Sequence, residues 1–138
     1  MRILIAEDDP NDRKLLSLAA RPEGIAEFSI VEDGHAILEY LQGEGAFADR
    51  DSFPFPDVVV LDLKMPLLDG LEVLRWIRGV SGWPRLPVVL LSGSGLNKDV
   101  EEAYRLGANA YFRKPHSVKA LNAVIEAIVQ YWALAEKL

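Results

Sequence analysis

The amino-acid sequence predicts an α/β fold in which one five-stranded parallel sheet is doubly wound, with helices on both of its faces. Five short apolar runs recur at a regular spacing along the 138 residues. Three of them are continuous runs of β-branched residues or leucine without polar alternation, as in strands buried on both faces of a parallel sheet. The segments between the runs have helical spacing, and right-handed crossovers then place these helices on both faces.

The elements follow one another as strand and helix. The five apolar runs predict strands at Arg2–Ala6, Glu27–Val31, Asp57–Asp62, Pro87–Ser92 and Ala110–Arg113. After the first strand, Asp9 is suited to cap a helix that continues to about Ala20, because proline follows it at the first helical position. After the second strand, Gly34–Gln42 has apolar residues on one face and is followed by Gly43, which predicts a helix that stops there.

Three more helices complete the alternation. We expect them over Gly70–Arg78 and Asn97–Leu106, each followed by a glycine, and from about Ser117 nearly to Leu138. Residues 43–56 contain glycines, prolines and charges, and they are long for a connection within a compact domain. We therefore expect either a mobile loop or a contact surface in that segment.

The composition is that of one soluble domain and excludes several kinds of protein. Because the chain has no cysteine, it can form neither a disulfide nor a thiolate zinc site, and it has no thiol nucleophile. The formal net charge of −6 and the scattered basic residues argue against direct binding to DNA. The N-terminus is no signal peptide and no apolar segment could span a membrane, so we expect a cytoplasmic protein without membrane contact.

Polar side chains stand at the carboxyl ends of four expected strands, where ligands bind to parallel α/β sheets. Taken singly, each has an ordinary explanation: Asp62 can cap the loop that follows it, and three consecutive acids favour the N-terminus of a helix. Together they indicate one site, made of Glu7, Asp8, Asp9, Asp62, Ser92 and Lys114.

The residue types in this cluster suit phosphoryl chemistry. Clustered carboxylates repel one another unless a cation or a shared proton relieves them, and Mg²⁺ suits oxygen ligands that include phosphate. Asp62 could then be a nucleophile that carries a phosphoryl group. The metal and Lys114 would supply positive charge to the transferring group, and Ser92 could donate a hydrogen bond to one of its oxygens.

These motifs resemble the receiver domain of two-component response regulators. The matching residues are the acidic pair Glu7-Asp8, the phospho-acceptor Asp62 within LDLKMP, the hydroxyl and small residue Ser92-Gly93, the aromatic switch position Tyr111, and Lys114-Pro115. The resemblance covers essentially the whole chain. It implies a flavodoxin-like (β/α)5 fold with strand order 2-1-3-4-5. Because nothing follows the last helix, we expect one receiver domain over residues 1–138 without an output domain.

The resemblance implies that Asp62 takes a phosphoryl group from the phosphohistidine of a sensor histidine kinase. It also implies that Mg²⁺ is bound by Glu7, Asp8, Asp62 and the main-chain carbonyl of Lys64. Such a protein is not an enzyme, except that it catalyses its own phosphorylation and dephosphorylation.

The resemblance further implies how the signal leaves the site. Ser92 is drawn toward the phosphoryl group and Tyr111 moves inward, which reshapes the surface formed by residues 97–106, residues 110–113 and the last helix. A cis peptide bond between Lys114 and Pro115 is also implied, although most X–Pro bonds are trans.

Some features depart from the commonest family pattern or narrow it. Ser92 stands where threonine is more frequent, and Gly93 stands where alanine is. Lys64 and Ser94 occupy positions that tune the lifetime of the phosphoryl group in the family, and we hypothesise that Lys64 alters autodephosphorylation. The long loop and LGANAYFRKP before the last helix resemble regulators paired with phytochrome kinases, so the partner kinase could be a phytochrome.

The last helix carries two apolar stripes. The first is expected to pack on the sheet and consists of Val118, Leu121, Ile125, Ile128 and Trp132. The second consists of Val124, Ala127, Tyr131, Leu134 and Leu138. A helix that is apolar on two sides is usually buried on both. The second stripe therefore packs either on a neighbouring helix of the same chain or, together with the helix over residues 97–106, in a homodimer.

Two other functions remain open at this stage. The first is a metal-dependent phosphohydrolase that forms an aspartyl phosphate. Such an enzyme usually has a second aspartate two residues after the nucleophile as its general acid, and here that residue is Lys64. The second is a binding module that works without phosphorylation, against which the intact site argues.

Overall fold

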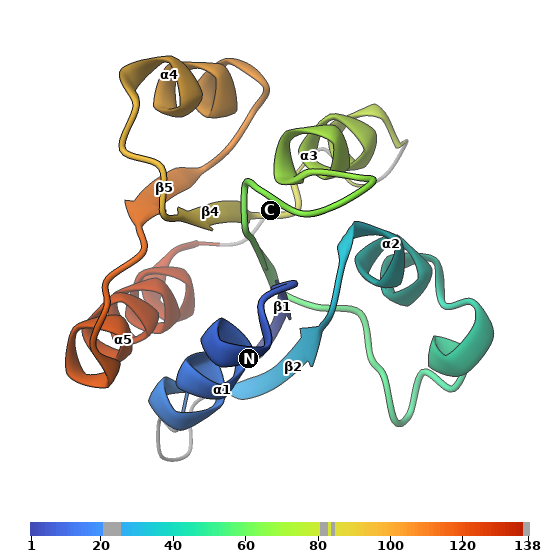
Figure 1. The fold of residues 1–138 in the computed structure, drawn as a ribbon. Coiled ribbons are helices and arrows are strands. Elements are labelled where there is room, and N and C mark those ends of the chain that lie inside the picture. Colours follow the sequence, from blue (N-terminus) through green and yellow to red (C-terminus); the bar gives the residue numbers. More distant parts are fainter. Residues whose placement is uncertain (21–25, 81–82, 84, 137–138) are drawn as a thin grey trace.

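The structure is a computed structural model that describes residues 1–20, 26–80, 83 and 85–136 (Figure 1). Within these residues one sheet has the strand order β2-β1-β3-β4-β5, and all neighbouring strands are parallel. The strands are β1 (Arg2–Ala6), β2 (Glu27–Val31), β3 (Val58–Leu61), β4 (Val88–Ser92) and β5 (Ala110–Arg113). The predicted fold class and strand order are confirmed.

Helices cover both faces of the sheet, as the alternation predicts. They are α1 (Pro10–Ala19), α2 (Gly34–Gln42), α3 (Gly70–Gly79), α4 (Asn97–Arg105) and α5 (Val118–Leu134), with a short 3-10 helix, η1 (Gly45–Phe47). In Figure 1, α1 and α5 lie on one side of the sheet and α2, α3 and α4 on the other. In the described part of the chain, no helix is long and apolar enough to cross a bilayer.

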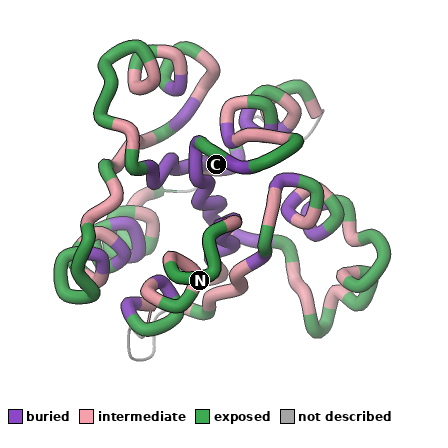
Figure 2. The backbone as a smooth tube through the Cα atoms, viewed as in Figure 1, coloured by how far each residue is buried: buried purple, intermediate pink, exposed green. Residues whose placement is uncertain are grey.

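The apolar runs are buried on both faces because successive strand residues point to opposite sides. Leu4, Val59 and Leu90 belong to the core beneath α2, α3 and α4. Ile5 and Val60 belong to the core beneath α1 and α5. The buried segments accordingly gather along the central strands (Figure 2). The three strands that read as continuous apolar runs are therefore the three in the middle of the sheet.

The element boundaries differ from the prediction at a few ends, for physical reasons. β3 is one residue shorter at each end than expected; before its start, the Arg2 N–H donates to the Asp57 carboxylate at 2.8 Å and not to a main-chain carbonyl. β4 begins after Pro87, which has no N–H to donate. The last helix ends at Leu134, because Ala135 is extended. It is therefore shorter than expected, and Leu138 lies outside the described residues.

Residues 43–56 are an anchored loop along α2. The guanidinium of Arg50 donates to the carbonyls of Tyr40 and Leu41, both at 2.8 Å, and so binds the C-terminal end of α2. The Tyr40 hydroxyl donates to the carbonyl of Pro54 at 3.0 Å. These bonds explain how a connection of this length stays packed against the domain, and they do not favour the alternative of a mobile loop.

The two stripes of α5 have different surroundings. Leu121, Ile125 and Ile128 of the first stripe are buried against the sheet, as predicted, although Val118 at the start of the helix is exposed. In the second stripe, Tyr131 is 65% exposed and Leu134 is 84% exposed. The alternative that a neighbouring helix of the same chain covers these two side chains is therefore wrong.

Candidate functional site

Asp62 lies directly after β3 and is buried, with two donors on its carboxylate. Its Oδ1 accepts the N–H of Lys64 at 3.2 Å, and its Oδ2 accepts from Lys114 Nζ at 2.9 Å. The chain that follows returns so closely that a Cβ on Gly70 would lie 2.2 Å from the carbonyl oxygen of Asp62. Only glycine fits there, so the start of α3 packs directly against the backbone of Asp62.

Glu7 and Asp8 follow β1 and face Asp62. Glu7 is fully buried and Asp8 is half-buried. Glu7, Asp8 and Asp62 each offer a carboxylate oxygen, and these oxygens lie within 4.8 Å of one another. The Arg13 guanidinium donates to the main-chain carbonyls of Glu7 at 3.0 Å and Asp8 at 2.8 Å, which fixes this turn. Three carboxylate oxygens without a soft ligand have the composition of a site for a hard divalent cation.

Asp9, the third consecutive acid, has a different role. Its carboxylate accepts the N–H groups of Asn11 at 2.8 Å and Asp12 at 3.4 Å, so it caps α1. Pro10 occupies the first helical position. The cap predicted from the Asp9-Pro10 pair is confirmed, and Asp9 is no member of the cluster.

Lys114 is the cation of the site and lies just after β5. Its N–H donates to the carbonyl of Ser92 at 2.7 Å, which continues the pairing of β5 with β4. Its Nζ donates to Glu7, to Asp62 at 2.9 Å and to Asp12 at 3.0 Å. One ammonium therefore binds three carboxylates.

This surplus of negative charge is visible in the pKa values. Burial raises the pKa of Glu7 from 4.5 to about 7, against the hydrogen bond from Lys114 that lowers it, and the charge of Asp62 raises it further. Burial by itself would lower the pKa of Lys114, but hydrogen bonds to Glu7 and Asp62 outweigh it and raise that pKa. Lys114 therefore stays protonated, and the net negative charge of the site favours binding of a further cation.

The cluster opens into a pocket of about 530 Å³ at the carboxyl ends of the strands. Ser92 ends β4 and is buried, and its Oγ accepts the N–H of Ser94 at 3.2 Å. The lining residues are Asp12, Asp62, Lys64, Ser92, Gly93, Ser94, Gly95, Leu96, Lys114 and His116. A small anionic group could therefore reach both Asp62 and Lys114.

Tyr111 of β5 is connected to the same loop. Its side chain is half-buried, and its hydroxyl donates to the main-chain carbonyl of Ser94 at 2.8 Å. Its N–H donates to the Tyr104 hydroxyl of α4 at 3.1 Å. Tyr111 thus joins the loop after Ser92 to β5 and α4.

The structure brings every predicted site residue to one edge and adds one that the prediction missed. The side chain of Lys64 is exposed, while its backbone touches Asp62 as described above. The added residue is Asp12, whose Oδ2 binds Lys114. Asp12 is an acid in the first turn of α1, and that position alone does not predict its contact with Lys114. The implied cis peptide is wrong: the bond between Lys114 and Pro115 is trans, which is the usual form of an X–Pro bond.

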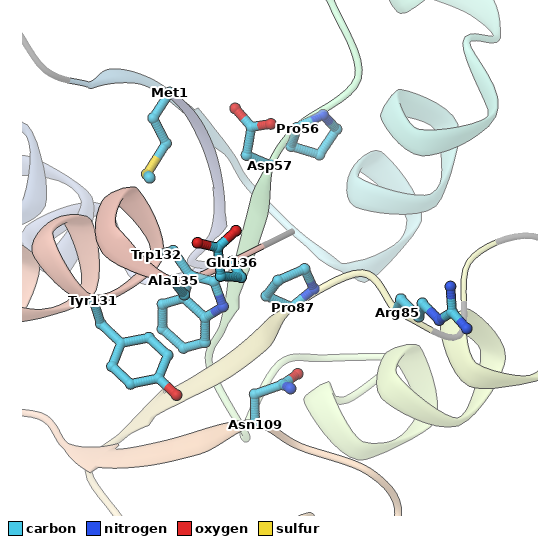
Figure 3. Close-up of a pocket in the computed structure, with 10 residues that line it drawn as sticks. All are labelled: Met1, Pro56, Asp57, Arg85, Pro87, Asn109, Tyr131, Trp132, Ala135 and Glu136. Carbon is cyan, nitrogen blue, oxygen red and sulfur yellow. The ribbon is translucent and has the colours of Figure 1, made fainter. Parts of the chain in front are cut away.

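A second hollow, of about 430 Å³, lies at the opposite edge of the sheet (Figure 3). Pro56, Asp57 and Pro87 line it just before β3 and β4, and Tyr131 and Trp132 of α5 close one side. The carboxylate of Asp57 in this hollow already accepts the N–H of Arg2. The charged cluster, by contrast, lies at the carboxyl edge, where parallel sheets bind their ligands.

A comparison with known families agrees with this geometry. The family model of the response regulator receiver domain matches residues 3–126. The chain belongs to this family. The motifs and the strand order that the resemblance implied are therefore those of a receiver domain.

Three relatives stand out among the similar proteins. Response regulator Rcp1 of Synechocystis sp. is 34% identical over 94% of this chain and 87% of its own length. The response regulator RPA3017 in red light signalling of R. palustris is 37% identical, with a TM-score of 0.89 over 99% of this receiver domain and 96% of that chain. The phosphorylated cyanobacterial phytochrome response regulator RcpA is 33% identical, with a TM-score of 0.86 over 99% and 96% of the two chains.

This receiver domain is thus related to a regulator of red-light signalling and to a phytochrome response regulator. One solved structure of Rcp1 is its Mn²⁺-bound form, with 32% identity and a TM-score of 0.81 over 99% of this chain and 97% of that one. Together with the carboxylates of Glu7, Asp8 and Asp62, this relative supports divalent-metal binding by the acidic cluster.

Proposed function

We propose that this receiver domain accepts a phosphoryl group on Asp62, in a Mg²⁺-dependent transfer from the phosphohistidine of a sensor histidine kinase. The observation that carries the proposal is the buried Asp62 carboxylate, 2.9 Å from Lys114 Nζ and close to Glu7 and Asp8, at the floor of an open pocket. In the transfer, an Asp62 oxygen forms a bond to phosphorus while the phosphorus–nitrogen bond breaks. The imidazole nitrogen keeps the electron pair and takes a proton from solvent.

The acidic cluster fits Mg²⁺ because all its available ligand atoms are oxygens. Glu7, Asp8, Asp62 and the main-chain carbonyl of Lys64 would hold the ion. When bound, it supplies positive charge that offsets the carboxylates and the oxygens of the transferring group.

The remaining steps belong to side chains of the receiver domain. Lys114 is positioned to pair with a phosphoryl oxygen, since its ammonium already touches the accepting carboxylate. Ser92 lines the pocket and would donate its hydroxyl to another oxygen, which draws its loop toward Asp62. Because the Tyr111 hydroxyl binds that loop at Ser94, the movement reaches β5, α4 and α5. This surface would carry the signal.

The intact mass after incubation with acetyl phosphate and Mg²⁺ tests the proposal. We expect the gain of one labile phosphoryl group, which requires the metal and is absent from Asp62→Asn. Asp57→Asn is a matched control, because this acid lies at the opposite edge of the sheet. A wild-type chain whose mass stays unchanged, both with acetyl phosphate and with a phosphorylated kinase, would refute phosphoryl acceptance.

We also propose that the donor is a histidine kinase of the phytochrome class. RcpA and RPA3017 support this, since both are regulators of red-light or phytochrome signalling that this receiver domain matches over nearly their whole length. Transfer from an autophosphorylated bacterial phytochrome should be faster than transfer from an unrelated sensor kinase. Equal rates from both kinases would exclude the preference.

We also propose that the chain forms a homodimer through α4 and α5, in which a second copy covers the second apolar stripe of α5. Tyr131 and Leu134 are exposed on α5, and Tyr104 on α4 is 49% exposed. Apolar side chains of this size gain free energy when a second copy covers them. The double variant Tyr131→Glu, Leu134→Glu should be monomeric at high concentration, as measured by sedimentation velocity. A double variant that stays dimeric would exclude this surface.

The alternative, a phosphohydrolase that acts on external substrates, is not favoured. The position two residues after Asp62 is Lys64, whose exposed ammonium cannot act as the carboxylic general acid that a leaving alcohol needs. We therefore propose that the domain catalyses only its own phosphorylation and dephosphorylation. Release of phosphate from a phosphomonoester such as p-nitrophenyl phosphate over many turnovers would contradict this.

A further inference from the structure

Lys114 binds three carboxylates, and two of them also take part in the proposed phosphoryl transfer. Asp62 becomes the phosphoryl carrier, and Glu7 belongs to the acidic cluster that would hold the metal. Asp12 is the third partner, with its Oδ2 at 3.0 Å from Lys114 Nζ. Asp12 is neither a proposed metal ligand nor the proposed phosphoryl acceptor. Its ion pair with Lys114 can therefore persist when the metal binds and when Asp62 is phosphorylated.

Asp12 is held in place by the start of α1. The Asp9 carboxylate accepts its N–H at 3.4 Å, and Pro10 restricts the backbone of the same turn. Arg13, the next residue, ties the turn to the carbonyls of Glu7 and Asp8. The Asp12 side chain is 31% exposed, at the rim of the pocket, while that of Lys114 is 12% exposed. A fixed carboxylate thus holds the end of a long and otherwise flexible side chain.

We propose that Asp12 is a positioning residue, which holds Lys114 over Asp62 before and after phosphoryl transfer. The inference rests on the proposed function and names a residue that the phosphoryl chemistry itself does not touch. A lysine has a four-carbon stem and three rotatable donors, so its ammonium needs a fixed partner to stay in place. When Glu7 binds the metal and Asp62 carries the phosphoryl group, Asp12 is the carboxylate that still holds the ammonium, beside the phosphoryl oxygen.

Two other roles for Asp12 make different predictions. An acid in the first turn of a helix is stabilised by the helix dipole, and a role limited to that would affect only stability. An acid at the rim of the pocket could also repel anionic donors, in which case its removal would speed up phosphorylation. Positioning predicts the reverse, because a displaced Lys114 cannot stabilise the transferring group.

The experiment compares wild type with Asp12→Asn, which keeps the shape and removes the charge. The initial rate of phosphorylation by acetyl phosphate in Mg²⁺ should fall about tenfold, as expected for the loss of one charge-assisted contact that orients a catalytic group. Asn11→Asp added to Asp12→Asn restores the net charge and a first-turn acid on an exposed side chain, and it should leave the rate low. Asp12→Glu should recover part of the rate, because it can again reach Lys114.

The Lys114 ammonium gives a second readout, by ¹⁵N NMR of lysine-labelled protein. We expect a slowly exchanging Nζ signal in the wild type with and without the phosphoryl group. In Asp12→Asn the signal should exchange faster than in the wild type in both states, because one carboxylate partner of the ammonium is absent. An unchanged signal with an unchanged rate, or a rate that rises, overturns the inference while leaving phosphorylation of Asp62 intact. A wild-type chain that gains no phosphoryl group overturns both.

Discussion

The two edges of the sheet use polar residues in opposite ways. At the edge where the strands begin, Asn109 Oδ1 accepts the N–H of Val88, and the Asp57 carboxylate accepts the N–H of Arg2, each at 2.8 Å. Arg78 donates to the carbonyls of Gly107 and Leu86. These polar side chains complete backbone hydrogen bonds, so their role is structural.

At the carboxyl edge polar side chains also bind the backbone, but several charged ones bind one another. Glu7, Asp12 and Asp62 share the single ammonium of Lys114, and burial raises the pKa of Glu7 to about 7. Such a surplus of negative charge costs stability, and the protein retains it where a cation and a phosphoryl group can use it. The comparison teaches that several carboxylates gathered around one ammonium separate a reactive edge from a structural one.

The largest effect is expected where the reactive edge is shaped by a backbone contact. Gly70→Ala puts a Cβ 2.2 Å from the carbonyl oxygen of Asp62. We expect it to lower the free energy of unfolding by about 4 kcal/mol and to displace Asp62, with loss of phosphorylation. Gly79→Ala, at the exposed end of the same helix with no atom within 4 Å of the added Cβ, should be neutral. Urea unfolding and intact mass measure both, and equal effects would contradict the assignment.

Removal of the shared cation comes next. Lys114→Ala leaves the carboxylates of Glu7 and Asp62 without their cation and should lower stability in EDTA by about 3 kcal/mol. Addition of Mg²⁺ should recover part of this loss in urea unfolding, because a second cation then meets the same acids. The exposed Lys119→Ala is the control. A Lys114 variant as stable as wild type would show that the carboxylates do not depend on it.

The opposite edge should respond in stability alone. Arg78→Ala leaves the carbonyls of Gly107 and Leu86 without a donor and should cost about 2 kcal/mol. Phosphorylation by acetyl phosphate should keep its rate, since no group of the site touches Arg78. Arg75→Ala, on the exposed side of the same helix, should change neither quantity. A slower phosphorylation rate in a folded Arg78 variant would break the division between the edges.

The smallest effect is a pH dependence of the metal-free chain. The pKa of Glu7 is raised from 4.5 to about 7 by burial, so the folded state holds this proton more tightly than the unfolded state. Its stabilising contribution is complete below pH 4.5 and is lost as the pH rises through 7. Glu7→Gln does not titrate. Its advantage over wild type in EDTA should therefore grow by about 1 kcal/mol over this range, after screening by water in the open pocket.

A control with an exposed acid separates this effect from the general titration of the surface. Glu44→Gln should differ from wild type by the same amount at both ends of the range, since Glu44 is exposed. If the difference between Glu7→Gln and wild type does not change with pH, burial does not hold the Glu7 proton.

The sequence by itself determined the strands, most helix bounds and the edge at which the site lies. These features are local: apolar runs such as Val58–Leu61 and caps such as Asp9 read directly from neighbouring residues. The site members Glu7, Asp62, Ser92 and Lys114 followed because parallel strands all end at the same edge, so that position along the chain implies proximity in space. The resemblance to a known family then narrowed their roles.

Only the tertiary structure decided which of these groups touch. Asp12 and Lys114 are 102 residues apart, and nothing in either segment records their contact. It arises because Asp9 and Arg13 fix the start of α1 beside the end of β1, within reach of the Lys114 side chain that follows β5. The exposure of Tyr131 and Leu134 was likewise undecided, since an apolar stripe has the same spacing whether a helix covers it or not. Periodicity records which residues share a face, and packing decides what that face meets.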